Sequence, residues 1–446
     1  MTTAAAGLAA RARATDMRAL PSDPQGVLDL PPGFSYRVLS RAGDHMHDGY
    51  RVPGNPDAMG VFQVGGELIL MRNHEVSPGD RDRGPYLPGM TAPKQAFDAE
   101  AYGGVTRVVL DASSLAVRRQ ELALCGTHWN CAGGLSPWGW LSCEEIFSPG
   151  HGYVFLAPHT HAGLAQASPI KPYGRFRHEA ASVDPQTLIA YLSEDRDDAA
   201  FYRFVPAAAD TPFKGRLQAL RVLGQPRFDT STLHVGKSLP IDWVDVPEPD
   251  PQEDTVRFQA RERGAARFSR TEGLWLSDDE LFVCATTGGP IGHGQILRIT
   301  QRSPRPTLSV VAQSDDPAEL DMPDNITVSP HGEIVIAEDG LEGNYLRRVT
   351  REGAVIDFAR NALSSSELTG PCFAPDGKTL FVNLQRDGLT LAIRGPFEEE
   401  LQRAPAAKGN SDTRASGPGF ASVTAGLVTL SLAALMHRRR KLGAAG

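Results

Sequence analysis

The stretch DNITVSPHGEIVIAEDG, residues 324–340, contains two short apolar runs that are joined by the turn residues Pro-His-Gly. Val and Ile dominate both runs, as is typical of β-strands. A short turn that contains Pro and Gly suits a tight connection between antiparallel strands. The stretch therefore predicts a β-hairpin that carries acidic residues at both of its open ends.

Five other segments repeat this pattern of strand, turn, strand and polar end, and they cover residues 60–75, 131–145, 178–195, 272–289 and 371–388. Three of the gaps between neighbouring segments are about 45 to 52 residues, and the gap of about 93 residues before 272–289 must hold an insertion. A period of about 40 to 50 residues built from β-hairpins is typical of propeller blades. We therefore predict an all-β fold, a six-bladed β-propeller with inter-blade insertions.

The chain divides by composition into four predicted parts. Residues 1–28 form an N-terminal segment that is poorly ordered or the remnant of a signal, and residues 29–401 form the propeller. Residues 208–262 read as an elaborated insertion between two blades, and residues 402–416 as a linker. No long amphipathic helical pattern occurs within the propeller region, which favours an architecture of strands.

Residues 417–441 predict a single C-terminal hydrophobic helix or a sorting tail. About 20 uncharged residues precede Arg438, Arg439, Arg440 and Lys441, and this length suits one bilayer span whose basic end stays in the cytoplasm. The propeller would then be periplasmic or on the cell surface, as a secreted or membrane-anchored protein. A buried terminal helix is the alternative. The N-terminus lacks the basic and apolar regions of a signal peptide, so the export route stays open.

Charge and cysteine usage exclude several classes of function. The 446-residue chain has a formal net charge of −8 and no basic footprint before its C-terminus, so we expect no nucleic-acid binding. Its five cysteines form no CxxC pair, which argues against a zinc ribbon or a dense disulfide framework. Nucleotide-binding glycine motifs and a GxSxG elbow are absent as well. We expect a monomer that acts on a small molecule.

The acids of the six hairpins recur at one phase of the repeat. Residues near the start of the first strand are Cys131, Glu179, Glu272, Asp324 and Asn325. Residues near the end of the second strand are Asn73, His74, Glu75, Glu144, Glu145, Glu194, Asp195, Glu338 and Asp339. Because antiparallel partners lie about 5 Å apart, both sets should ring one mouth of the central channel.

A ring of so many carboxylates requires positive charge, because close acids cannot all ionise side by side. Carboxylate and amide oxygens suit Ca²⁺. The Cys131 thiolate adds a soft ligand that calcium does not need, and this favours a transition metal such as iron beside the calcium. Any one of these acids taken alone is more often an ordinary solvated strand end, and Cys131 alone is more often a small buried side chain.

Two arginines precede channel acids by two residues each. Arg270 precedes Glu272 and Arg177 precedes Glu179, so either guanidinium is placed to hold a phosphate through paired hydrogen bonds. His74 is a further candidate to contact the substrate. For Arg177 the alternative is to balance neighbouring acids, and for His74 it is a structural role. Trp138 and Trp140 are expected to pack between strands.

The motifs NHE (73–75), CAGGLSPWGWLSCEE (131–145), RHEA (177–180), TEG (271–273), PDNI (323–326) and AEDG (337–340) together resemble the PhoX family of alkaline phosphatases. The resemblance runs in order from about residue 29 to residue 397. It implies a six-bladed propeller with a calcium and iron (Fe³⁺) cluster in its channel, which hydrolyses phosphomonoesters outside the cytoplasm.

The resemblance also implies roles for individual residues. Cys131 and Glu145 would bind iron, and Arg270 would hold the substrate phosphate. The remaining members of the metal cluster would be Glu179, Glu272, Asp324 and Asn325, and Glu194 and Glu338 lie in family motifs as further candidate ligands. Since neighbouring strand residues face opposite ways, Glu144 should turn away from the metals, whereas Cys143 lies deeper on the side of Glu145.

The predicted function is metal-assisted hydrolysis of phosphomonoesters, with Arg270 and Glu272 as catalytic residues. No Ser or Cys nucleophile is required. A calcium-dependent propeller lactonase of the gluconolactonase type would use Glu and Asn ligands with one calcium and no thiolate. A non-catalytic propeller that binds a partner at the cell surface is the third alternative.

Overall fold

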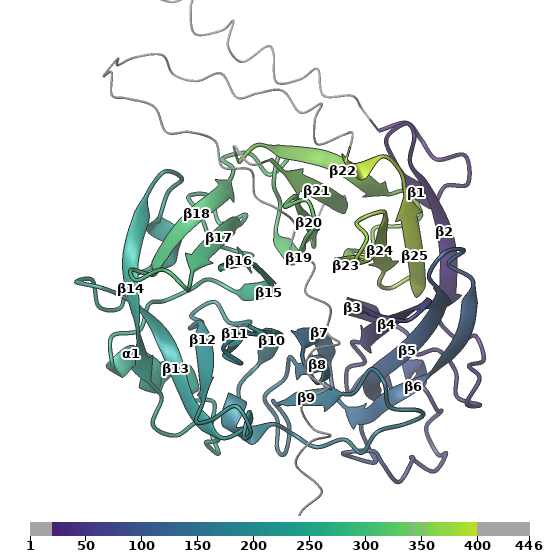
Figure 1. Ribbon diagram of the computed structural model, residues 1–446, viewed down its shortest axis with the longest axis horizontal. Coiled ribbons are helices and arrows are strands. Elements are labelled where there is room, and N and C mark those ends of the chain that lie inside the picture. The colour runs from purple at the N-terminus through teal and green to yellow at the C-terminus, as the bar shows by residue number, and fades with distance from the viewer. Residues whose placement is uncertain (1–19, 341–342, 351–352, 399–446) are drawn as a thin grey trace, which may run out of the picture. The chain divides into compact units, whose positions relative to one another are not determined.

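The computed structural model describes residues 20–340, 343–350 and 353–398 of the chain. These belong to one compact unit, residues 1–404, whereas a second unit, residues 405–446, lies outside the described residues together with the predicted linker and tail. The described chain is almost entirely β-structure, and its single α-helix is the short α1 (Val256–Glu262). Its sheets stand side by side around a central axis (Figure 1).

The strands form five hydrogen-bonded sheets. Two of them have four strands each: β3 (Pro56–Val64), β4 (Glu67–His74), β5 (Gly103–Asp111) and β6 (Val117–Thr127); then β2 (Ser35–Arg41), β25 (Leu389–Arg394), β24 (Thr379–Leu384) and β23 (Leu368–Phe373). A three-stranded sheet holds β7 (Asn130–Ser136), β8 (Gly139–Glu144) and β9 (Val154–Ala157). A five-stranded sheet holds β1 (Leu28–Asp29), β22 (Val355–Asn361), β21 (Tyr345–Val349), β20 (Ile334–Glu338) and β19 (Pro323–Val328).

The fifth sheet has nine strands and corrects the prediction of six separate blades. Its order is β10 (His178–Val183), β11 (Ala190–Glu194), β12 (Tyr202–Pro206), β13 (Gly215–Val222), β14 (Ser238–Asp245), β18 (Thr307–Gln313), β17 (Gln295–Thr300), β16 (Glu280–Ala285) and β15 (Thr271–Ser277). The insertion supplies β14, which pairs with β13 through residues 241–245 and with β18 through residues 238–240. The strand β14 thus joins the strands β10–β13 and β15–β18 into one sheet. The fold is therefore propeller-like with five sheets instead of six blades.

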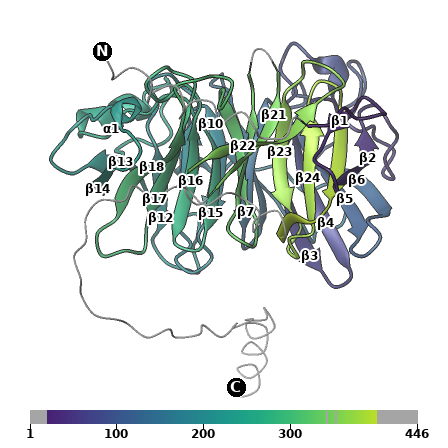
Figure 2. The ribbon, with the colours of Figure 1, turned by 90° about the horizontal axis from the view of Figure 1, so that it is seen from above.

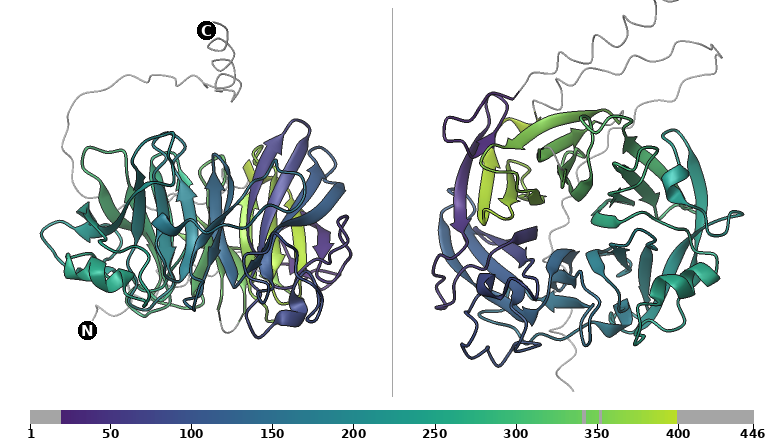
Figure 3. Two further views of the ribbon diagram at one scale, coloured as in Figure 1. Left: turned by 90° about the horizontal axis from the view of Figure 1, so that it is seen from below. Right: turned by 180° about the vertical axis from the view of Figure 1, so that it is seen from behind.

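Each of the six predicted hairpins is present as an antiparallel pair, and the first strands of these pairs lie closest to the axis (Figure 1). Contacts between neighbours join them in a closed circle in the order β3, β7, β10, β15, β19, β23 and back to β3. The side views show these strands crossing the thickness of the ring (Figures 2 and 3). The circle brings the corresponding ends of all six hairpins to one channel.

The ring is closed by strands from the beginning of the described chain. β1 pairs with β22, and β2 pairs with β25, so two early strands complete the two last sheets. Asp29 reinforces the first junction through an ion pair with Arg360, whose Nη2 lies 2.5 Å from Asp29 Oδ2. Closure ties the ends of the ring together without leaving the last hairpins as open edges.

Apolar side chains fill the space between the sheets. The largest cluster includes Trp140, Phe155, Phe201 and Phe268, all of them fully buried. The Trp140 indole donates a hydrogen bond to Asn73 Oδ1 at 2.8 Å, and Trp138 packs edge-on against Phe213. The predicted packing role of both tryptophans is confirmed. Within the described residues, no helix is long and apolar enough to cross a membrane.

A β-bulge recurs near the start of the first strand in all six hairpins. The register shifts between Pro56 and Met59, Asn130 and Gly133, His178 and Ala181, Thr271 and Leu274, Pro323 and Ile326, and Thr369 and Cys372. At each shift two residues of the inner strand lie opposite one residue of its partner. Such an insertion bends the strand and re-aims a side chain, and here it does so at one level of the ring.

In the sixth hairpin the first bulged residue is Gly370. It has a φ of +60°, and a Cβ atom at this position would lie 2.5 Å from the backbone oxygen of Asp57. We expect Gly370→Ala to destabilise the protein by roughly 2 kcal/mol or more, since the left-handed conformation alone costs about 1–2 kcal/mol and the clash adds to it. Urea unfolding of the purified variant measures this loss.

Gly66→Ala is the matched control, because a Cβ atom added at Gly66 would have no neighbouring atom within 4 Å and this residue has no left-handed φ. The substitution should change the free energy of unfolding far less than Gly370→Ala. Equal effects of the two substitutions would contradict the role given to the sixth bulge.

Candidate metal centre in the channel

The bulges turn five chemically active side chains into the channel. The first bulged residues of the first five hairpins are Asp57, Cys131, Glu179, Glu272 and Asp324, and all five are buried. Together with Gly370 they form one level of the ring, which we call the bulge level. A single recurring irregularity of the backbone thus collects four carboxylates and one thiol.

A second level, the mouth level, consists of the residues that follow the second strands. In each hairpin the backbone N–H of this residue donates to the carbonyl of a residue before the first strand, at 2.8 to 3.2 Å. The donor–acceptor pairs are Glu75–Asn55, Glu145–Trp129, Asp195–Arg177, Thr286–Arg270, Asp339–Met322 and Gln385–Glu367. Four of these six acceptor residues, Asn55, Trp129, Arg270 and Met322, have a left-handed φ of 44° to 50°. Such backbone strain is typical of functional sites.

The two levels bring metal-ligating atoms within 4.8 Å of one another in four overlapping groups. These are Asp57, Glu75 and Cys131; Cys131, Glu145 and Glu179; Glu179, Glu272 and Asp324; and Asp324, Asp339 and Glu367. Neighbouring groups share Cys131, Glu179 or Asp324, so the ligands form one continuous arc. Each group thus places three ligand side chains close enough together to bind one cation.

Burial and mutual repulsion perturb the acids of the arc. Burial, with neighbouring carboxylates adding to it, raises the pKa of Asp57, Glu179 and Glu272 well above the usual range. The same causes raise the pKa of Glu75 to about 7 and of Asp339 to about 6. Buried acids pay this penalty unless positive charge compensates them. The protein therefore offers a strong electrostatic site for cations.

Cys131 and Glu179 lie next to each other in the middle of the arc. The Cys131 Sγ is 3.2 Å from Glu179 Oε1, and Glu179 Oε2 is buried with no hydrogen-bond partner among the described residues. Burial is the main cause that raises the pKa of Cys131 well above its usual value, and nearby acids add to it. A buried carboxylate oxygen without a hydrogen-bond partner, next to a thiol, is a candidate metal ligand.

Two arginines cover one side of the arc. Arg270 contacts Asp195, with Nε 2.8 Å from Oδ1, and it also pairs with Glu272. Arg177 pairs with Glu145 and lies 3.5 Å from Asp195. Burial acts to raise the pKa of Asp195, but Arg270 and Arg177 outweigh it and lower the pKa. Asp195 thus remains ionised and orients both guanidinium groups.

The acids on the opposite side of the arc are not ion-paired among the described residues, although Arg83 and Arg386 line the cavity beside them. Within the described ranges, no ion pair is formed by Asp57, Glu75, Asp324, Asp339 or Glu367. A cavity of about 330 Å³ opens beside this side of the arc. Its lining is almost entirely polar and consists of Asn55, Glu75, Ser77, Asp80, Arg83, Trp129, Glu367, Gln385 and Arg386.

The structure brings together most of the predicted ligands. Cys131, Glu145, Glu179, Glu272 and Asp324 lie in the arc. Asn325 follows Asp324 on the same bulge, where its Nδ2 donates to Asp324 Oδ1 at 2.6 Å and its Oδ1 accepts from Gly370 N at 2.5 Å. Asn325 thus holds a ligand of the arc and links the fifth and sixth hairpins.

Three of the predicted residues have other partners. Glu194 accepts hydrogen bonds from Ala200 N and Tyr202 Oη at 3.0 and 2.8 Å, and Glu338 accepts from Asp321 N and Arg347 Nε at 2.8 and 2.9 Å. His74 is buried between Gly54 O and Thr106 Oγ1, at 3.0 and 2.9 Å. None of the three lies in the arc, because each is the last residue of its strand and faces away from the channel.

The next residue along each of these strands occupies the channel instead. Asp195 follows Glu194, Asp339 follows Glu338, and Glu75 follows His74, and the reversal of direction follows from the alternation of strand residues. The same alternation places Glu144 away from the arc, as predicted, against His151. Cys143 is fully buried in an apolar cluster, and the described chain leaves all five cysteines free.

Four arc residues are not among the predicted ligands. Glu75 and Asp339 were at least placed in the ring of acids, whereas the other two, Asp57 and Glu367, were not identified at all. Both precede the segments that define the repeat, 60–75 and 371–388. The signal that would have found Asp57 is the dipeptide Pro-Asp at 56–57, which matches Pro323–Asp324 of the fifth hairpin. Glu367 lies three residues before its bulge, whereas the equivalent residues of the other hairpins lie two residues before theirs, because the sixth hairpin is paired for one residue longer.

Comparisons with known proteins relate this geometry to a family. The family model of alkaline phosphatase PhoX matches residues 15–121 and 113–388. The structure of Pseudomonas fluorescens PhoX in complex with vanadate, a transition state analogue, matches with a TM-score of 0.65 at 18% identity, over 85% of this chain and 98% of that chain. A gluconolactonase of Xanthomonas campestris reaches a TM-score of only 0.41 at 12% identity, over 85% and 99%. A search of curated protein sequences finds no match.

The raised pKa values predict how metal-free protein responds to pH. In the folded state Glu75 and Asp339 bind protons up to about pH 7 and 6, whereas unfolded carboxyls lose them near about 4. The folded state therefore holds more protons between these values, and its stability is lost as the pH rises. Protein stripped with a chelator should have a lower Tm at about pH 8 than at about pH 5.5.

The control is the same measurement with calcium restored, which should remove this decline because the ions replace the bound protons. Asp339→Asn should reduce the decline in metal-free protein. A metal-free Tm that stays level or rises between the two pH values would contradict the electrostatics described for the arc.

Proposed function

The chain belongs to the PhoX family of alkaline phosphatases, enzymes that hydrolyse phosphomonoesters, and we propose that the channel arc is its active site, with calcium and iron as cofactors. The observation that carries this proposal is the continuous arc of buried and partly buried acids around one thiol, with arginine ion pairs at Glu145 and Glu272 among the described residues. A phosphomonoester requires cations on its oxygens, and the two sides of the arc supply them in different ways.

The donor atoms divide the arc between the two metals. Cys131, Glu145 and Glu179 combine a soft thiolate with carboxylates, which suits iron. The groups around Glu272, Asp324 and Glu367 contain oxygen ligands alone, which suit Ca²⁺. Glu179 belongs to a group of each kind, and its unpartnered Oε2 would be available to a metal ion. Bound metal ions would supply Lewis-acid polarisation of the phosphoryl oxygens and activation of the attacking oxygen.

The residues of the chain itself bind and orient the substrate. Arg270 and Arg177 lie at the mouth level and point at the carboxylates of the arc. When a phosphoryl group enters the mouth, Arg270 would release Glu272 and Arg177 would release Glu145. Both guanidinium groups would then contact the phosphoryl oxygens. The Asp195 carboxylate keeps Arg270 in place through two hydrogen bonds, at 2.8 and 3.3 Å. Arg270 would then offset the charge that grows on the equatorial oxygens.

The cavity beside the mouth would accept the organic part of the substrate. Its volume of about 330 Å³ lies at the lower end of the range for small-molecule pockets. The lining is polar, so we expect phosphomonoesters of hydrophilic alcohols rather than of lipids. Because PhoX proteins are generally exported, we also propose that the enzyme acts in the periplasm or at the cell surface.

Activity assays with one acid changed at a time test this proposal. Purified protein should hydrolyse p-nitrophenyl phosphate, and a chelator should abolish the activity. Glu272→Gln removes one negative charge from the arc and one of the two carboxylate partners of Arg270, so we expect kcat to fall by roughly 10²- to 10³-fold. Steady-state kinetics with the metal-loaded protein measure the loss.

Glu280→Gln is the matched control, because Glu280 begins β16 on the far side of its hairpin and pairs only with Arg298, at 3.5 Å, among the described residues. Its kcat should equal that of the parent protein. The proposal fails if metal-loaded protein lacks phosphatase activity, or if both substitutions reduce the activity alike.

A further inference from the structure

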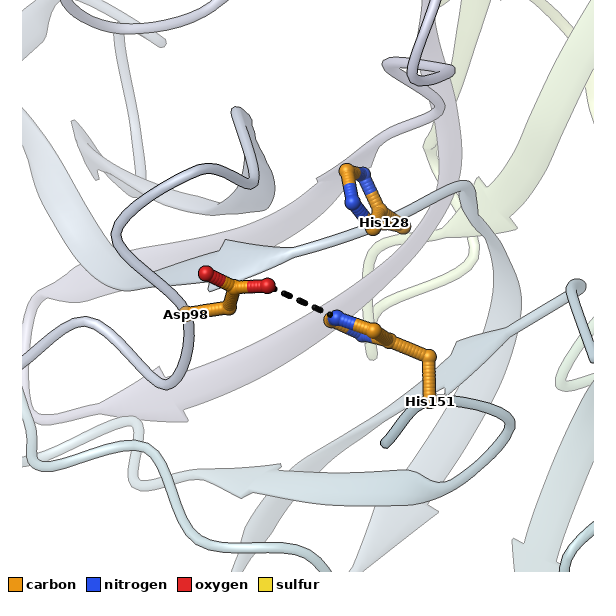
Figure 4. A group of neighbouring side chains, drawn as sticks. All are labelled: Asp98, His128 and His151. Atoms are coloured by element: carbon orange, nitrogen blue, oxygen red, sulfur yellow. Dashed lines mark hydrogen bonds and ion pairs between the residues drawn. The ribbon is translucent and has the colours of Figure 1, made fainter. Parts of the chain in front are cut away.

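A second group of metal-ligating side chains lies outside the channel, behind the hairpin β7–β8. It consists of Asp98, in the segment before β5, His128, between β6 and β7, and His151, between β8 and β9 (Figure 4). One ligand atom of each side chain lies within 4.8 Å of the others. Two imidazoles and one carboxylate from three separate segments therefore converge at one point of the fold.

His151 is oriented from behind by Glu144. The fully buried Glu144 carboxylate accepts hydrogen bonds from the backbone N–H groups of His128, at 3.0 Å, and of Gly152, at 2.9 Å. His151 Nδ1 lies 2.7 Å from Glu144 Oε1. A carboxylate that accepts a hydrogen bond from one ring N–H orients the imidazole so that its other nitrogen can bind a metal, as is usual for histidine ligands.

The other ring nitrogen of His151 faces a second acid. Nε2 lies 3.2 Å from Asp98 Oδ2, the contact drawn in Figure 4. Burial acts to lower the pKa of His151, but Glu144 and Asp98 outweigh it and raise the pKa, so without a metal the ring can carry a second proton and donate it from Nε2 to Asp98. A metal ion that binds here would take the place of this proton. Two ligands of one tetrahedral zinc ion are about 3.3 Å apart, given metal–ligand distances near 2.0 Å. The 3.2 Å between Nε2 and Asp98 Oδ2 is therefore a hydrogen-bond distance that a shared zinc ion could also occupy with little movement of either side chain.

His128 is the third member of the group (Figure 4). Its side chain is largely buried, with a residue exposure of 9%, and its Nδ1 has no hydrogen-bond partner among the described residues. Its ring centroid lies 4.6 Å from that of His151. Burial, together with the charge of His151, lowers the pKa of His128, so the ring is neutral at neutral pH, as a metal ligand must be.

We propose that Asp98, His128 and His151 form a second metal site for a divalent transition ion, with zinc as the best fit, and that Glu144 is its positioning residue. Imidazole and carboxylate ligands suit zinc, and the site has no thiol. The site is separate from the arc in its ligands, since no histidine lies in any of the four channel groups.

An ion at this site would stabilise the position of the hairpin β7–β8, which contains the channel ligand Cys131 and directly precedes the channel ligand Glu145. His128 lies three residues before Cys131, and Glu144 is the direct neighbour of Glu145. Asp98 belongs to the segment that crosses behind them, where its N–H donates to Gly126 O at 2.9 Å. The ion would join three segments that no disulfide connects, and it would stabilise the position of the Cys131 bulge.

X-ray absorption at the zinc edge tests the site in purified protein that retains its channel metals. After one equivalent of zinc is added, the ion should be bound with nitrogen and oxygen ligands near 2.0 Å and with imidazole scattering, but with no sulfur near 2.3 Å. Zinc at Cys131 would show the sulfur, and zinc among channel carboxylates would lack the imidazoles. Either spectrum, or the absence of bound zinc, would overturn the proposal.

Two substitutions give a second measurement. Asp98→Asn keeps the side-chain shape and should weaken zinc binding at least tenfold, as should His151→Ala. His161→Ala is the control, because His161 is exposed and outside the group, and it should bind zinc like the parent protein. Competition with a chromophoric chelator measures the Kd. An unchanged Kd in folded Asp98→Asn, where only one charge is removed, would contradict the site independently of any phosphatase activity.

Discussion

A β-bulge in the first strand of every hairpin is the constraint on which the channel depends. Regular strands would alternate their side chains between the two faces of each sheet. The bulge inserts one residue, so that one side chain is re-aimed toward the axis. Because it recurs six times in a closed circle, it gathers Asp57, Cys131, Glu179, Glu272 and Asp324 at one level. Asn55, Trp129, Arg270 and Met322 each precede one of these bulges and have a left-handed backbone conformation. The arrangement therefore includes local backbone strain.

The consequence of this geometry is a concentration of like charge that the fold itself does not neutralise. Arginine ion pairs are confined to Glu145, Asp195 and Glu272, on one side of the arc. The remaining acids are buried or partly buried, and their pKa values are raised. Apolar packing between the sheets holds the acids together against this repulsion. Metal ions bound by these acids, together with the guanidinium groups of Arg177 and Arg270, would make the channel suited to a phosphoryl group.

The hairpins and much of the site could be predicted from the sequence, but only where a local pattern of residues was sufficient. Recurrence at one phase predicted Cys131, Glu145, Glu179, Glu272 and Asp324, and the resemblance distinguished Glu145 from Glu144. The same alternation, applied to the other strand ends, would have replaced Glu194 and Glu338 with Asp195 and Asp339. Asp57 and Glu367 were missed because they precede the apolar runs. The pairing of β14 with β18 joins residues about 70 apart, and no local pattern reports such a contact.

The central claim is that the channel thiol and its neighbouring acids hold iron within a larger metal cluster. Anomalous diffraction from crystals of the purified protein, recorded on both sides of the iron absorption edge, tests it most directly. Our account predicts an iron peak bounded by Cys131, Glu145 and Glu179, with further density that lacks the iron signal near Asp324 and Glu367. A channel without iron in protein that is active as a phosphatase would contradict it.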